Sequence, residues 1–149
     1  MSDKIVEEWK QNGSLYFWRY LENTRNYPGW HLSADNLFCQ SFANLIDKML
    51  ASRWSSQKLL VVDSPSSEVL LVPNNLNGKA RWKSAQKILL KCLKDKVAKD
   101  YFLLEETNNQ VTLSLGEQKL NLLRECVLSI PQRKIDYSIG SENSQIWFW

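Results

Sequence analysis

One side chain in this sequence is suited to acid-base chemistry near neutral pH. It is His31, the only histidine, which follows Trp30 and stands four residues before Asp35. Because a carboxylate can orient an imidazole, this pair allows a small-ligand or catalytic pocket near His31, which is our third hypothesis. We favour the simpler interpretation, in which His31 makes a structural hydrogen bond beside a turn.

Other catalytic signals are missing from the sequence. It contains no Gly-x-Ser-x-Gly motif, no glycine-rich phosphate loop and no pair of histidines for a metal ion. Asp63, Glu105 and Glu106 could supply an acid and a base, but neighbouring residues of a strand point to opposite faces. We therefore lean against an enzyme and predict no catalytic residue and no cofactor.

The three cysteines form neither a disulfide framework nor a metal motif. Cys39, Cys92 and Cys126 are odd in number, lie far apart and include no Cys-x-x-Cys pair. We expect all three to be small buried hydrophobic side chains. The sequence thus predicts no metal site.

Lysines recur every four residues in one basic segment, residues 79–99. They are Lys79, Lys83, Lys87 and Lys91. A helix there would carry them as a stripe opposite its apolar face, and such a stripe can neutralise phosphates. A solvated helix face has the same pattern, and the formal net charge of the chain is only +3. Nucleic-acid binding through this segment is therefore our second hypothesis.

The chain has seven tryptophans, and several aromatic residues gather near turns and near the end of the sequence. Tryptophan and tyrosine dominate the binding energy of many protein interfaces, although buried rings of the same kind also close hydrophobic cores. Our first hypothesis is a non-enzymatic protein that binds another protein through an exposed aromatic patch. The residues expected to contact the partner are Trp18, Tyr20, Tyr27, Trp30, Trp147 and Trp149.

The beginning of the chain resembles the openings of some small bacterial immunity proteins that neutralise toxins. The resemblance rests on Trp9, Trp18, Thr24 and the run Pro28-Gly29-Trp30. It spans residues 9–30 only, and no family assignment rests on it. The resemblance implies a protein partner, which places protein binding ahead of the alternatives.

The candidate residues are positioned by helices and strands, and the first half of the chain has clear signals for these elements. We expect a short helix over 5–9, a strand over 15–20 and an extended run over 30–33, with a hairpin turn at Pro28-Gly29. Asp35 is expected to cap a helix whose apolar residues recur at spacings of three and four until it ends near Ser52.

Two apolar runs, 58–62 and 69–72, predict strands around a turn, both central in a sheet that is covered on both faces. Segment 80–99 is ambiguous, and we favour a helix over a strand because alanine, lysine, glutamine and leucine dominate it.

The last third of the chain alternates strands and a helix. Segments 101–106 and 111–115 predict a hairpin in which Asn109 takes a left-handed conformation. A helix is expected to begin at Gly116-Glu117 and to end by Pro131. Segments 136–139 and 146–149 predict two final strands.

The composition, 44% hydrophobic and 23% charged residues, is ordinary for a globular protein. We predict one α+β domain over residues 1–149, with a largely antiparallel sheet built from hairpins and packed by two or three amphipathic helices. No apolar run is long enough to span a membrane, and the start lacks a secretory signal, so we expect a cytoplasmic protein. The oligomeric state stays open.

Overall fold

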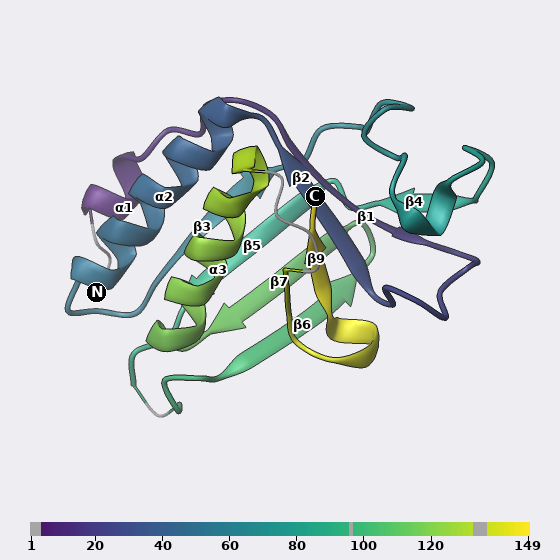
Figure 1. Ribbon diagram of the computed structural model, residues 1–149. Coiled ribbons are helices and arrows are strands. Elements are labelled where there is room, and N and C mark those ends of the chain that lie inside the picture. The colour runs from purple at the N-terminus through teal and green to yellow at the C-terminus, as the bar shows by residue number, and fades with distance from the viewer. Residues whose placement is uncertain (1–3, 96, 133–136) are drawn as a thin grey trace.

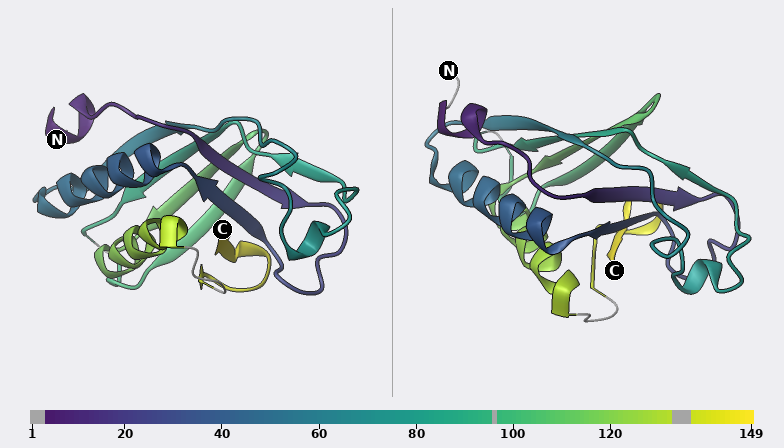
Figure 2. Two further views of the ribbon diagram at one scale, coloured as in Figure 1. Left: turned by 45° about the horizontal axis from the view of Figure 1, so that its top comes forward. Right: turned by 90° about the horizontal axis from the view of Figure 1, so that it is seen from above.

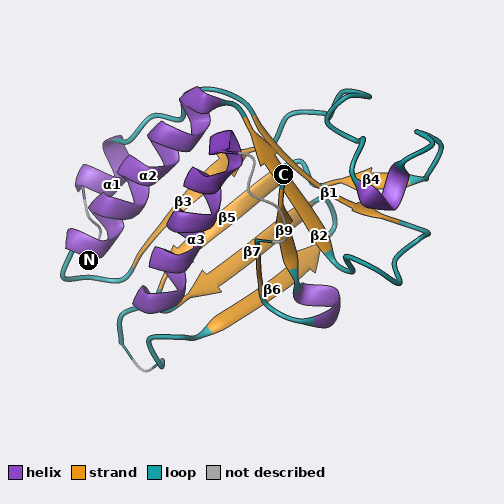
Figure 3. Cartoon of the chain, viewed as in Figure 1, coloured by secondary structure: helices purple, strands orange, loops and turns teal. Residues whose placement is uncertain are grey.

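The computed structural model describes residues 4–95, 97–132 and 137–149, and in these ranges three α-helices accompany two β-sheets (Figures 1 and 3). The helices are α1 Lys4–Glu8, α2 Asn36–Ala51 and α3 Glu117–Ser129, and the short 3-10 helices are η1 Pro73–Asn75, η2 Ile130–Gln132 and η3 Glu142–Ser144. The strands are β1 Leu15–Tyr20, β2 Trp30–Ala34, β3 Ser56–Val61, β4 Trp82–Ser84, β5 Lys87–Cys92, β6 Phe102–Thr107, β7 Gln110–Leu115, β8 Ser138–Ile139 and β9 Ile146–Phe148. The predicted α+β class is confirmed.

The two sheets are mostly antiparallel. One has five strands in the order β4-β1-β2-β9-β8, and the other has four in the order β3-β5-β7-β6. Each contains one parallel pair, β2 with β9 and β5 with β7, so the molecule is not built from hairpins alone.

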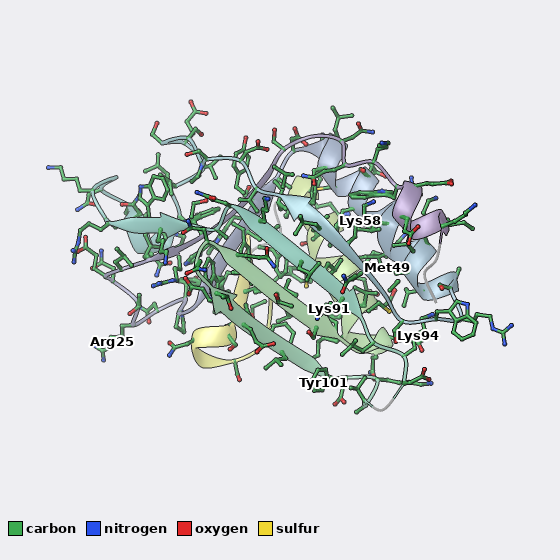
Figure 4. The ribbon with its side chains drawn as sticks, turned by 180° about the vertical axis from the view of Figure 1, so that it is seen from behind. Arg25, Met49, Lys58, Lys91, Lys94 and Tyr101 are labelled. Atoms are coloured by element: carbon green, nitrogen blue, oxygen red, sulfur yellow. The ribbon has the colours of Figure 1, made fainter. Side chains whose placement is uncertain are left out.

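Helices α2 and α3 pack on one face of the four-stranded sheet, as the turned views show (Figure 2). Alternate residues of β5, namely Ile88, Leu90 and Cys92, are buried against them. The helix expected after Asp35 is confirmed, because the Asp35 carboxylate accepts a hydrogen bond of 2.9 Å from the Phe38 N–H and satisfies an N-terminal donor. From behind, no helix among the described residues covers the other face of this sheet (Figure 4).

The five-stranded sheet is made from both ends of the chain. Strands β1 and β2 form the expected hairpin, although its connection runs over residues 21–29 and is much longer than a tight Pro-Gly turn. Strand β9 lies parallel to β2, with Trp30 opposite Ile146, and it separates β2 from β8. The two predicted C-terminal strands are therefore present, while Asp136 lies outside the described residues.

One continuous segment joins the two sheets between β4 and β5. The Ala85 N–H donates to the Phe17 carbonyl of β1, and the next residue, Gln86, accepts a hydrogen bond from the Val62 N–H just after β3. The chain thus passes directly from one sheet to the other, and both sheets share one hydrophobic core with α2 and α3.

The helix favoured for residues 80–99 is wrong, because this segment forms β4 and β5. Ile88, Leu90 and Cys92 alternate with Lys87 and Lys91, which is the period of a half-buried strand. Strands β3 and β7 supply hydrogen bonds on both sides of β5, and this tertiary pairing outweighs the helix propensity of its residues.

The second strand predicted after residue 58 is also wrong. Residues 69–72 form a turn and a bend instead of a strand, and Leu70 and Val72 are buried in a second, smaller hydrophobic cluster. Strand β3 lies at an edge of its sheet, with Leu59 and Val61 exposed on its outer face, so it is not covered on both faces.

The β6–β7 hairpin is confirmed with one change, since Asn108 and not Asn109 has a positive φ, of 56°. Helix α3 also matches its prediction and gives way to η2, which contains Pro131.

Segment 63–81 folds over the outer face of the five-stranded sheet. There Leu70, Val72 and Ala80 enclose Trp18 and Tyr20 of β1. Strand β1 therefore buries both of its faces, one against the helices and one against this segment. The second cluster is the base on which the surface described next is built.

Candidate functional site

Of the six aromatic residues expected at an interface, three are buried and three are half-buried. Trp30 points into the main core and stacks on Phe17, with ring centroids 4.7 Å apart. Trp18 and Tyr20 point the opposite way but are covered by segment 63–81. All three residues are buried, so the structure leaves them no surface with which to contact a partner.

Tyr27, Trp147 and Trp149 lie together at the surface, and we call these three residues the aromatic rim. The Tyr27 ring meets Trp147 edge-on at 4.7 Å and Trp149 at 5.3 Å between ring centroids. The Trp147 indole N–H donates to the Pro28 carbonyl at 3.0 Å. Each rim residue is half-buried, so part of each side chain remains accessible to a partner.

The backbone of Tyr27 takes a conformation that few non-glycine residues adopt, with φ of 52°. Such left-handed residues persist where their surroundings hold them, and here the surroundings are the rings of Trp147 and Trp149. The loop between β1 and β2 thus presents the Tyr27 ring to the C-terminal strand.

His31 lies directly beneath the rim. Its Nδ1 accepts a hydrogen bond of 2.9 Å from the Trp149 indole N–H, and its ring stacks near Trp18 and meets Tyr20 edge-on. Burial lowers the pKa of His31 from 6.5 to about 3, so the imidazole is neutral at physiological pH.

This environment gives His31 a structural role. It is only 1% exposed, so solvent and ligands do not reach it. Asp35, the expected orienting carboxylate, instead accepts the N-cap hydrogen bond of α2. The structure therefore offers no support for acid-base chemistry at His31.

Two buried asparagines hold the loops around the rim in place. The Asn74 side-chain amide donates to the carbonyls of Asn23 and Asn26, each at 2.8 Å, and so ties η1 to the loop that carries Tyr27. Asn75 donates to the Leu70 carbonyl at 3.0 Å, and the same carbonyl accepts the Tyr20 hydroxyl at 2.6 Å. No sequence signal marks these two residues, because asparagines near a proline are also typical of an ordinary loop.

Two hollows flank the rim. One, of about 460 Å³, is lined by Arg25, Tyr27 and Leu76 among others, and Figure 4 places Arg25 at one end of the molecule. The other, of about 600 Å³, is lined by Leu71 and Trp149 among others. Leu71 is 55% exposed and Leu76 is 82% exposed, so both hollows have apolar side chains at their surfaces. The sequence pattern does not indicate these two leucines as surface residues, since it predicts a buried strand at Leu71.

The four lysines of the basic segment do not form one stripe. Lys79 lies in a loop, and Lys83 of β4 contacts Glu106 at 3.1 Å. Lys87 and Lys91 lie on the outer face of β5, with Leu89 between them. Because the segment forms two strands of two different sheets, the spacing of four does not place the lysines side by side.

The remaining chemical groups give little indication of catalysis or metal binding. Cys39, Cys92 and Cys126 are free and buried, and burial raises the pKa of each thiol to about 11. Within the described ranges, no three His, Cys, Asp or Glu side chains are grouped so that they could hold a metal ion. In the same part of the chain, no helix combines the length and apolar character needed to cross a membrane.

The chain matches no protein-family model, no curated protein and no solved structure.

Proposed function

We propose that this protein works by binding another protein, and that the aromatic rim with its two hollows is the contact surface. The observation that carries the proposal is the meeting of Tyr27, Trp147 and Trp149 at the surface, with exposed Leu71 and Leu76 on either side. Partly accessible aromatic rings on a rigid base are typical of the residues that dominate protein interfaces.

Two further features support a binding surface in this position. The rim is fixed in the free protein, because Trp147 and Trp149 donate hydrogen bonds to Pro28 and His31, and Trp149 also packs against the second cluster. Little conformational entropy is then lost on association, which favours affinity. The likeness of residues 9–30 to small bacterial immunity proteins is consistent with a protein partner.

The proposal does not include catalysis or nucleic-acid binding. His31 is shielded from solvent, and the lysines of segment 79–99 are divided between a loop and two strands. We also propose a cytoplasmic location, which agrees with three free cysteines, since thiols remain reduced in that compartment.

Affinity capture from source-cell extracts, with paired double variants as bait, tests the proposal. L71D/L76D places carboxylates in the two hollows without altering the three rings of the rim, and we expect it to lose the captured protein. The control L59D/V61D changes one leucine and one valine, 43% and 56% exposed, on the outer face of β3, away from the rim. Equal capture by both variants, with circular dichroism showing both folded, would refute the rim as the contact surface.

A further inference from the structure

The two edges of the four-stranded sheet differ in how they are closed. At the β3 edge, the Gln11 side-chain amide donates to the Val61 carbonyl at 2.8 Å and accepts from the Val61 N–H at 2.9 Å. A side chain thus takes the place of a neighbouring strand at that edge, and Lys58 donates to the Glu7 carbonyl of α1 nearby. Edge strands blocked in this way do not readily pair with other chains.

The opposite edge, β6, has no such cover among the described residues. The Gly116 N–H donates to the Tyr101 carbonyl, so odd-numbered residues of β6 direct their backbone groups toward β7. By the alternation of a strand, the N–H and C=O groups of Phe102, Leu104 and Glu106 point away from the sheet. In the described part of the chain, these groups form no hydrogen bond with protein.

A hollow of about 590 Å³ runs along this free edge. One wall is formed by three consecutive residues of β6, Phe102 to Leu104, and the other by residues of the segment around η3, including Gly140. Gly140 packs so closely on Phe102 that an added Cβ would lie 2.9 Å from its ring. Because a wall stands opposite the strand, the space suits one extended chain better than the edge of a second sheet.

We propose that β6 binds an extended peptide segment of another protein, which adds to the sheet as a fifth strand. Its backbone would satisfy the outward N–H and C=O groups of Phe102, Leu104 and Glu106. Side chains on the inner face of the added strand are apolar, because they lie beside Leu104.

The charge on β6 defines one further feature of this peptide. Glu105 lies on the outer face and, among the described residues, forms no ion pair, whereas Glu106 is held by Arg19 at 3.4 Å and Lys83 at 3.1 Å. A lysine or arginine of the peptide placed across from Glu105 forms a favourable cross-strand pair. Strand β6 belongs to another sheet than β9, which carries Trp147, and the proposal does not depend on the aromatic rim.

The test uses the acetylated and amidated peptide Val-Thr-Val-Lys-Val-Thr-Val, whose valines occupy one face and whose lysine occupies the other. Amide hydrogen exchange followed by NMR should slow by at least about tenfold at Phe102, Leu104 and Glu106 when the peptide is added at saturation. The same peptide with an N-methyl group on every residue should give no effect, since neither of its edges can complete the ladder of hydrogen bonds.

Two kinds of variant test position and charge. L104P removes one outward N–H of β6 and should abolish the effect, while L59P makes the equivalent change at the β3 edge and should leave it intact. E105K should prefer the peptide that carries glutamate in place of lysine. If L104P fails to fold, the N-methylated peptide and E105K still decide the question.

Three results would overturn the proposal. The first is slowed exchange at β3 instead of β6, and the second is equal binding of the N-methylated peptide. The third is a dimer of the free protein whose contact protects β6, because the occupant would then be a second copy of the chain.

Discussion

Neighbouring aromatic residues in this protein have different roles because strand side chains alternate between faces. Phe17 and Trp30 stack in the main core, while Trp18 and His31, one residue further along each strand, stack on the opposite face, where Trp18 belongs to the second cluster. Composition and spacing do not show whether the outer face of β1 is covered. It is covered only because segment 63–81 folds over it, and this contact decides which rings a partner can reach.

His31 makes stability depend on pH in a predictable direction. Its pKa is about 3 in the folded protein and 6.5 in its ordinary state, so between these values the unfolded chain binds more protons. The free energy of unfolding therefore falls as pH decreases through this window, by about 2 kcal/mol from this residue at pH 5 relative to pH 8. Urea unfolding at the two pH values measures the loss.

The matched variant for this prediction is H31N, whose amide oxygen can still accept the Trp149 indole N–H but does not titrate. We expect its stability to depend less steeply on pH than that of the parent protein. The same slope in both proteins would show that acid destabilisation arises from carboxylates and not from the buried imidazole.

At the scale of elements, the side chains of β9 alternate between a buried face and a half-buried face, and this difference can be tested by mutation. Phe148 is 1% exposed and points into the main core, whereas Trp147 is half-buried on the other face. We expect F148A to lower the free energy of unfolding by roughly 3–5 kcal/mol and W147A to lower it by less, although tryptophan is the larger residue. Denaturant unfolding of both variants checks this order, and a larger loss for W147A would contradict it.

The elements that could be predicted are those with local signals. Asp35 and the following apolar spacing were sufficient for α2, and Pro131 marked the end of α3. For segment 80–99 the local signals disagreed, because its residues favour a helix while Ile88, Leu90 and Cys92 alternate as in a strand. Pairing with β3 and β7 decided the outcome, and neither partner is adjacent in the sequence.

The candidate site could be predicted only in part for the same reason. Tyr27, Trp147 and Trp149 were identified by residue type, but their contact joins positions about 120 residues apart along the chain. Leu71 and Leu76 were missed, since their exposure depends on how segment 63–81 folds over β1. Residue types thus suggested the aromatic surface, while tertiary structure determined which of its members are accessible.

At the scale of the whole molecule, the three cysteines can be used as probes of the main core, because they lie both on the helices and on the four-stranded sheet. Cys39 lies on α2, Cys126 on α3 and Cys92 on β5, and all three are buried in the same hydrophobic cluster. Burial raises the pKa of each thiol to about 11, so little of the reactive thiolate exists at neutral pH. Reaction with a thiol reagent therefore requires the helices to separate from the sheet.

We expect all three thiols to resist Ellman's reagent in native buffer and to react at one common rate in intermediate urea, where that rate follows global unfolding measured by circular dichroism. The single-cysteine variants C39A/C92A, C39A/C126A and C92A/C126A allow each thiol to be followed alone, with each variant's own unfolding rate as its control. If the two helices and the sheet form one cooperative unit, each thiol reacts only as its variant unfolds. Rapid reaction of one thiol below the unfolding transition would show that its element opens independently of the rest of the core.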